Sequence, residues 1–256
     1  MDATFRRLVA ACFLNQLGFQ AAYFVGIIGC ATYVLDAGAA EVSALVFVMN
    51  VVMLVGYSAA GALIDAVGPR IVLVASLALP LAAAAVVLAM PVCMASLLVV
   101  AIVMGLAGAA ASTAVETFPR YLTNDEVLLA RMNSLNSVVT FVAVITGPLF
   151  AGAIAGVTDN RLVFAVLPVT SVLGVLVALC LRERIRPEHP QDSGQTTPSL
   201  LARVADGVRA TVANPALIVL FAVCFLGTLG FGAFDSLESL FYRDVLRVGA
   251  EWMGWL

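Results

Sequence analysis

The stretch GALIDAVGPR, residues 61–70, joins two long apolar runs and decides how this part of the chain folds. The runs cover residues 44–64 and 71–90, and about 20 apolar residues are enough to cross a bilayer as a helix. A helix satisfies its own backbone hydrogen bonds in lipid, so both runs are expected to be helical. The glycines between them permit a sharp turn. We therefore predict two membrane helices joined by a tight loop.

The composition of the whole chain extends this prediction to its full length. Of the 256 residues, 62% are hydrophobic and 11% are charged, and the mean hydropathy is +1.07. Soluble domains have about 45–50% apolar and about 25% charged residues. A soluble enzyme is therefore excluded, and the predicted fold class is an all-α polytopic membrane protein in a lipid bilayer. No basic run could follow a phosphate backbone, which argues against nucleic-acid binding.

The cysteines indicate neither a disulfide framework nor a metal centre. All five lie in or beside apolar stretches, without a CxxC pair or a nearby histidine: Cys12, Cys30, Cys93, Cys180 and Cys224. This pattern is typical of small buried hydrophobic residues. We expect no metal, no cofactor and no catalytic residue.

Charges, prolines and glycines divide the chain into seven predicted spans. The spans cover residues 8–35, 44–64, 71–90, 93–115, 128–156, 162–181 and 216–237. Three regions follow: a six-helix transmembrane bundle at 1–181, a cytoplasmic linker at 182–214, and an incomplete second bundle at 215–256. Within the linker, residues 199–211 are either an amphipathic helix on the membrane surface or a solvated connector.

The arginines predict the orientation of the chain in a cell membrane. Ten of the 13 basic residues fall on one side of the predicted spans: Arg6, Arg7, Arg70, Arg120, Arg131, Arg182, Arg184, Arg186, Arg203 and Arg209. Three fall on the other side: Arg161, Arg243 and Arg247. Because positive charge concentrates in cytoplasmic loops, the N-terminus is expected in the cytoplasm.

The 61–70 loop also carries a recognisable motif. Gly61, Leu63, Asp65, Gly68 and Arg70 match the pattern G-x-L-x-D-x-x-G-x-[RK]. This loop resembles motif A of the major facilitator superfamily, which lies between the second and third spans in that family. The resemblance implies a transporter with two six-helix bundles that rock around a central site. It also implies that Asp65 and Arg70 stabilise the state closed on the cytoplasmic side.

A second motif lies in the fifth predicted span. Gly147, Pro148 and Gly152 form a G-P-x-x-x-G pattern that resembles motif C, which the family associates with export. The proline favours a kink, and the glycines permit close helix packing. Residues 118–137 are similar to the corresponding region of drug and siderophore exporters. The resemblance therefore implies efflux of small amphipathic molecules, with uptake by the same fold as the alternative.

Polar residues inside the spans are candidates for a substrate path, because such groups are costly in lipid. Gln16 and Gln20 share one helix face, and Asn50 lies in the next span. Interhelical hydrogen bonding is the alternative role for all three. Asn133 and Asn136 lie near the predicted cytoplasmic end, where we expect packing instead.

Asp235 and Glu238 form the candidate site for a coupling proton or cation. They are three residues apart near the outer end of the seventh span, where two carboxylates on one face can share a proton. A hydrated helix end close to Arg243 is the alternative. The family's usual arginine in helix 4 is replaced by Ala101, and the first span has no acidic residue. Proton antiport through those usual residues is therefore not expected.

The length of the chain leads to a further expectation. The resemblance accounts for six spans, a linker, a seventh helix and the start of an eighth. A chain cut there would be a fragment or a remnant that does not transport on its own. A seven-helix retinal protein is disfavoured because the chain has no lysine for a Schiff base, and the arginine distribution opposes a receptor topology.

Overall fold

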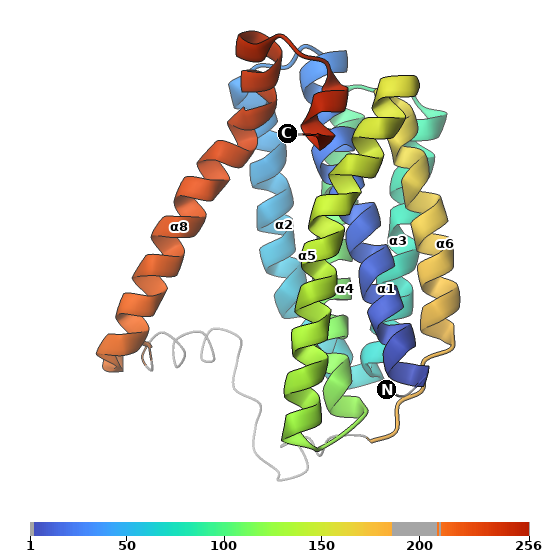
Figure 1. Cartoon of the computed structure of the whole chain (residues 1–256), viewed down its shortest axis with the longest axis vertical. Coiled ribbons are helices and arrows are strands. Elements are labelled where there is room, and N and C mark those ends of the chain that lie inside the picture. Colours follow the sequence, from blue (N-terminus) through green and yellow to red (C-terminus); the bar gives the residue numbers. More distant parts are fainter. Residues whose placement is uncertain (1–2, 186–208, 210, 256) are drawn as a thin grey trace. The chain divides into compact units, whose positions relative to one another are not determined.

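A computed structural model describes residues 3–185, 209 and 211–255 (Figure 1). Six of the described helical segments are long and apolar enough to cross a membrane. In chain order the elements are α1 (Ala3–Ala21) with π-helical η1 (Ala22–Ile28) and η2 (Cys30–Val34), α2 (Ala39–Val67), α3 (Pro69–Ala89), α4 (Met94–Thr117) with η3 (Phe118–Tyr121), α5 (Glu126–Val157), η4 (Asn160–Ala165) with α6 (Val166–Leu179), α8 (Pro215–Leu240), η6 (Phe241–Leu246) and η7 (Ala250–Gly254).

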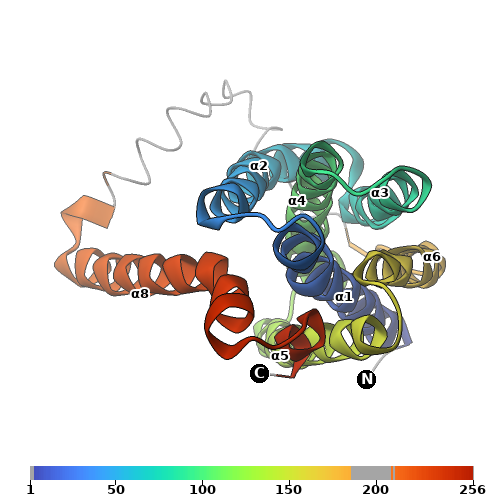
Figure 2. The same cartoon turned by 90° about the horizontal axis from the view of Figure 1, so that it is seen from above.

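The chain forms two compact units, of which the first contains the six long segments. It comprises Met1–Arg186 together with Leu237–Leu256, and the second comprises Pro187–Ser236. In the first unit α1 lies against α4, α5 and α6, and α4 packs between α2 and α3 (Figure 2). In the second unit, the described part of α8 carries exposed apolar side chains. This helix covers the whole of the predicted seventh span, residues 216–237.

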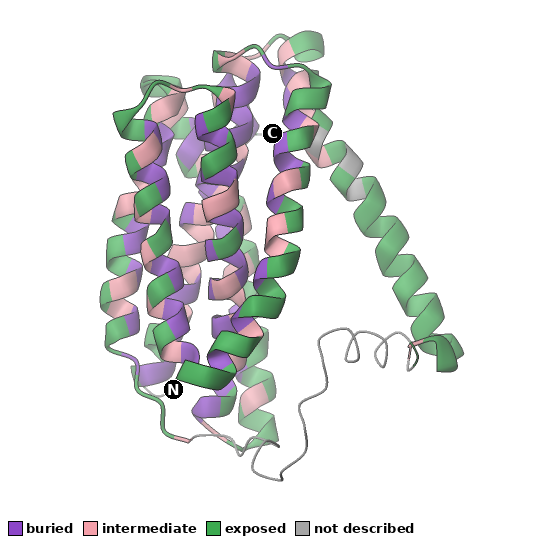
Figure 3. Ribbon diagram, turned by 180° about the vertical axis from the view of Figure 1, so that it is seen from behind, coloured by how far each residue is buried: buried purple, intermediate pink, exposed green. Residues whose placement is uncertain are grey.

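Burial differs sharply among the six segments of the first unit (Figure 3). We compare the most apolar 18-residue stretch of each segment. The buried share of this stretch is 67% in the segment that begins with α1 and 56% in the α4 segment, but only 28% in α2 and 22% in α5. The core has one apolar cluster around Phe164 and another around Phe118, both fully buried. The helices α1 and α4 therefore form the centre of the bundle, while α2 and α5 keep large exposed faces.

Local sequence explains where the key helices begin. The Asp125 carboxylate caps α5 by accepting hydrogen bonds from the backbone N–H groups of Val127 at 2.9 Å and Leu128 at 3.3 Å. Pro69 opens α3, a position where its missing N–H costs nothing. Gly68 precedes it with φ +89°, a conformation that favours glycine.

The observed helices confirm the predicted all-α membrane fold and place its first six spans. Each observed segment overlaps the span expected from hydropathy, with ends that differ by a few residues. The linker prediction at 182–214 and the helix prediction at 199–211 fall largely outside the described residues. In the 215–256 region the structure describes α8, η6 and η7.

Candidate functional site

A cavity of about 450 Å³ opens beside α1, α4 and α5. Its lining consists mainly of carboxamides and hydroxyls, with one carboxylate and a few apolar side chains: Cys12, Asn15, Gln16, Ser112, Val115, Glu116, Asn133, Asn136, Ser137, Thr140 and Phe141. Polar groups are costly against hydrocarbon, so a wall of this kind suits water or a polar solute. It is a candidate binding site.

Helical periodicity brings these side chains to one place. The α5 residues lie at positions i, i+3, i+4, i+7 and i+8, starting from Asn133, which is a single helix face. Cys12, Asn15 and Gln16 follow the same spacing in α1, as do Ser112, Val115 and Glu116 in α4. These positions belong to the first half of the segment Ala3–Val34, which α1 opens, the last turns of α4 and the first half of α5. The cavity therefore lies towards the end of the bundle where α1 begins.

Thr140 and Asn136 lie one turn apart on α5, and they differ in whether their polar side-chain atoms form hydrogen bonds. Thr140 Oγ1 lies 3.6 Å from the Cys12 Sγ atom, and the two form a hydrogen bond between α5 and α1. Asn136 is only 6% exposed, and neither its amide nitrogen nor its amide oxygen has a partner among the described residues. Buried amides with both atoms unpaired are rare in proteins.

The predicted substrate-path residues do not come together. Gln16 lines the cavity. Gln20 lies beside Gly147 instead, with its Cβ only 2.8 Å from where a Gly147 Cβ would stand. Asn50 is exposed and donates to the Val46 carbonyl of its own helix at 2.9 Å. Asn133 and Asn136, which we expected to serve packing, line the cavity. Their spacing with Ser137 and Thr140 is the sequence signal that identifies them.

The motif A loop lies at the same end of the bundle. The Arg70 backbone N–H donates to Glu183 Oε1 at 3.1 Å, and its guanidinium donates to the Leu179 carbonyl at 2.6 Å. A Cβ on Gly68 would stand 3.0 Å from the same Glu183 oxygen. Glu183 thus places a carboxylate at the positive N-terminus of α3. It was not predicted, because no local pattern links it to a loop 113 residues earlier.

The other residues of motif A are less closely packed than Gly68 and Arg70. Leu63 and Asp65 are exposed, and a Cβ on Gly61 would meet no atom within 4 Å. A second arginine contributes to this end of the bundle, since Arg7 donates to the Cys180 carbonyl at 3.0 Å. Together with Arg70, it binds the carbonyls at the end of α6, where the helix dipole favours cations.

The motif C glycines lie where α5 is closely packed. A Cβ on Gly152 would stand 2.6 Å from the Glu251 carbonyl oxygen and 3.1 Å from the Gly254 Cα. On the other face, a Cβ on Gly147 would stand 3.1 Å from the Leu17 carbonyl oxygen. Pro148 lies inside α5, and its carbonyl is in close contact with Gly254. These glycines therefore let α5 approach α1 on one face and η7 on another.

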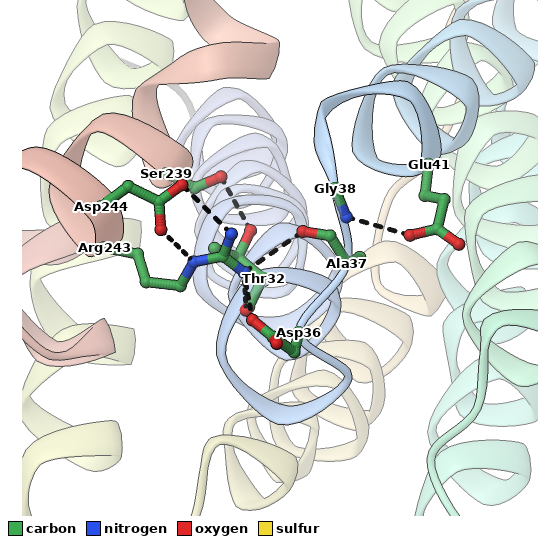
Figure 4. Close-up of polar contacts among 8 residues, drawn as sticks. All are labelled: Thr32, Asp36, Ala37, Gly38, Glu41, Ser239, Arg243 and Asp244. Carbon is green, nitrogen blue, oxygen red and sulfur yellow. Dashed lines mark hydrogen bonds and ion pairs between the residues drawn. The ribbon is translucent and has the colours of Figure 1, made fainter.

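At the opposite end from motif A, Arg243 joins two distant segments (Figure 4). Its guanidinium donates to the Thr32 carbonyl at 2.8 Å, to Asp36 Oδ1 at 2.9 Å and to the Ala37 carbonyl at 3.2 Å. Ser239 and Thr32 form a buried hydrogen bond of 2.8 Å between their hydroxyls. The segment after α8 is thereby fixed to the end of the first span.

Nearby carboxylates are held by hydrogen bonds. Asp244 accepts two from Arg243, at 2.7 and 3.2 Å, and these bonds lower the pKa of Asp244 and raise that of Arg243. Tyr242 donates to Glu238, and burial together with this bond raises the pKa of Tyr242. Asp235 is half-buried in the same helix as Glu238.

No cluster of metal-ligating side chains is found in the part of the chain that the structure describes. The five cysteines are free, and two of them, Cys12 and Cys30, are buried.

Comparisons with known proteins agree with this architecture. The family model described as Major Facilitator Superfamily matches residues 8–256. Among solved structures, the chain is similar to a crystal structure of a D-xylose–proton symporter, with a TM-score of 0.61 and 15% identity. The match covers 98% of this chain and 64% of the symporter, and at this identity it shows the fold alone. No curated protein sequence matches the chain. Because the family model covers nearly all of the sequence, the chain belongs to the major facilitator superfamily.

Proposed function

We propose that this chain contributes the first helix bundle of a secondary transporter, and that the amide-lined cavity is where a small solute binds. The cavity is the observation that carries the proposal. It is the size of a small-molecule site, for which about 300–1,000 Å³ is usual. Most of its lining residues carry an amide or a hydroxyl, although it lies among membrane-spanning helices. Residues 1–181 supply the bundle, 182–214 the linker, and 215–256 the beginning of a second bundle.

The distribution of arginines supports a cell-membrane orientation with the N-terminus in the cytoplasm. The cavity lies towards that same end of the bundle, so in this state it would be reached from the cytoplasm. The Arg243 network and the contact between α5 and η7 would then close the outer end. Alternating access requires that these outer contacts break when the cavity closes on the cytoplasmic side.

Each motif has a proposed part in this cycle. Asp65 and Arg70 would stabilise the state closed to the cytoplasm, with Glu183 holding the start of α3 in place. Gly147, Pro148 and Gly152 would form the close-packed part of α5 against which the outer end closes. Gln16 would line the substrate path, whereas Gln20 and Asn50 would support the helices around it.

The resemblance of Gly147, Pro148 and Gly152 to motif C favours export of small amphipathic molecules over uptake. For coupling we propose a proton. The similar structure is named a proton symporter, and the Asp235–Glu238 pair provides carboxylates near the predicted outer end. Glu238 is bound by Tyr242, which would respond to a change in its charge.

The test is transport in inverted membrane vesicles from cells that express the gene encoding this chain. Export predicts that a proton gradient drives the dye ethidium into these vesicles, and that vesicles carrying Asp65→Asn accumulate less. Uptake of D-xylose into right-side-out vesicles would favour the alternative direction. If neither solute moves faster than in vesicles without the protein, these two activities are excluded. Equal ethidium transport by wild type and Asp65→Asn would remove the role given to Asp65.

A further inference from the structure

The unpaired amide of Asn136 shows what kind of group the cavity is built to bind. This side chain is 94% buried in the wall of the cavity, yet neither amide atom has a hydrogen-bond partner in residues 3–185, 209 or 211–255. Thr140, one turn further along, is paired with Cys12 across the helix interface. The interface between α1 and α5 thus pairs Thr140 and leaves Asn136 without a partner. No described residue supplies a partner for Asn136, and the cavity that this residue lines is the adjoining space from which one can come.

A carboxamide is selective about such a partner. Its oxygen accepts a hydrogen bond and its NH₂ group donates one, and both lie in the same plane. The best complement is therefore a planar edge that carries a donor next to an acceptor. Side-chain amides bind the edge of adenine in this bidentate way. An ester or an ether lacks the donor and can satisfy only half of the amide.

The rest of the lining indicates the charge and polarity of the solute. Asn15, Gln16 and Asn133 add three more carboxamides within the same cavity. Among the residues that the structure describes, Glu116 is the only charged one that lines the cavity, and no arginine of this set does so. An anionic solute would meet no counter-charge there and would be repelled by Glu116. Phe141 supplies an apolar surface for a ring.

We propose that the cavity selects uncharged or cationic solutes with a planar donor–acceptor edge, such as a carboxamide or a lactam, and that Asn136 binds this edge. This inference rests on the proposed solute site and specifies the chemical class that the site takes. Asn136 acts as a specificity-determining residue that touches the solute. The remaining amides and hydroxyls surround the solute without fixing its class.

The test compares two probes of nearly the same shape on the purified chain in detergent. Benzamide carries the donor–acceptor edge, and methyl benzoate carries the acceptor alone. Because one net hydrogen bond changes affinity by about tenfold, wild type should bind benzamide about tenfold more tightly. Equal affinities, or no binding of either probe at millimolar concentration, would overturn the proposal. This comparison needs no variant, so it does not depend on how any substitution folds.

Two matched variants then locate the selectivity. Asn136→Leu has a similar volume, and removal of an unpaired buried amide should leave the melting temperature unchanged or raise it. We expect benzamide affinity to fall about tenfold, to the level of methyl benzoate. Asn50→Leu removes an amide that lies outside the cavity, and binding should not change. If Asn136→Leu lowers the melting temperature and leaves the probe preference intact, the amide is structural and the proposal is wrong.

The outcome is separable from that of the proposed transport. Selective binding of benzamide without transport of ethidium or D-xylose in vesicles would exclude those two activities and leave the site intact. Transport in vesicles without a preference for benzamide over methyl benzoate would contradict only the inference about Asn136.

Discussion

The two halves of α5 have different surroundings, although both belong to one helix: the first half lines a cavity, and the second half packs closely against other segments. From Asn133 to Phe141, one face of the helix lines a cavity with amides and hydroxyls. In the second half, a Cβ on Gly147 would stand 2.8 Å from Gln20 of α1, and a Cβ on Gly152 would stand 2.6 Å from Glu251 of η7, so neither position has room for one. Side-chain size and polarity therefore divide one helix into a binding half and a packing half. A substitution should affect binding in the first half and stability in the second.

The largest effect is expected in the packing half. In Gly152→Leu the Cβ would approach the Glu251 carbonyl at 2.6 Å, and backbone atoms cannot move aside as a flexible side chain can. Overpacking of this kind costs about 1–3 kcal/mol. A lower melting temperature of the purified chain would be the signature. Gly61→Ala is the matched control, since its Cβ meets no atom within 4 Å and alanine favours a helix. If both variants melt like wild type, the packing account of Gly152 fails.

A smaller effect is expected where the outer contacts hold the end of the first span. Arg243→Gln removes the charge that binds the Thr32 and Ala37 carbonyls, and it leaves Ser239 in place. Asp36 is 91% exposed, so its ion pair adds little. We expect a loss of about 1 kcal/mol from the two carbonyl contacts. Hydrogen exchange at residues 32–37 should become faster, whereas Arg247→Gln should leave it unchanged. Unaltered protection in Arg243→Gln would show that the network does not hold this end.

A still smaller effect on stability is expected at the motif A end of the bundle, where Glu183 contacts the start of α3. Glu183→Gln keeps the shape of the side chain but removes the negative charge at the start of α3. Charges at helix ends contribute about 0.3–1 kcal/mol. Exchange of the first α3 amides should therefore rise a few-fold, with the second half of α5 unaffected. A global drop in melting temperature would mean that Glu183 has a wider structural role.

The smallest effect is a pH dependence at the outer end. Hydrogen bonds from Arg243 lower the pKa of Asp244 below its ordinary value of 3.8. A carboxylate with a depressed pKa adds stability above its ordinary pKa, and this stability is lost as the pH falls through the lower folded-state value. Exchange at residues 241–246 should thus increase below about pH 4. In Asp244→Asn this increase should be smaller; an identical pH profile would exclude a contribution from Asp244.

Hydropathy and spacing were enough to predict the spans and the tight loop at Gly68. They could not identify contacts that depend on how helices pack against one another. Arg70 meets Glu183 across 113 residues, and Arg243 meets Asp36 across 207. The same limit applies to Asn136: its polarity is visible in the sequence, whereas the absence of a partner among the described residues is a property of the packed bundle.

The most direct test of this division is access of water to each half of α5. In a chain whose five native cysteines are replaced by serine, Ser137→Cys and Ala151→Cys would be exposed to a membrane-impermeant thiol reagent. Ser137 is exposed and lines the cavity, whereas Ala151 is fully buried. We predict rapid labelling at position 137, from the side of the membrane that holds the N-terminus, and no labelling at position 151. Equal labelling at both positions, or labelling only at 151, would contradict the account.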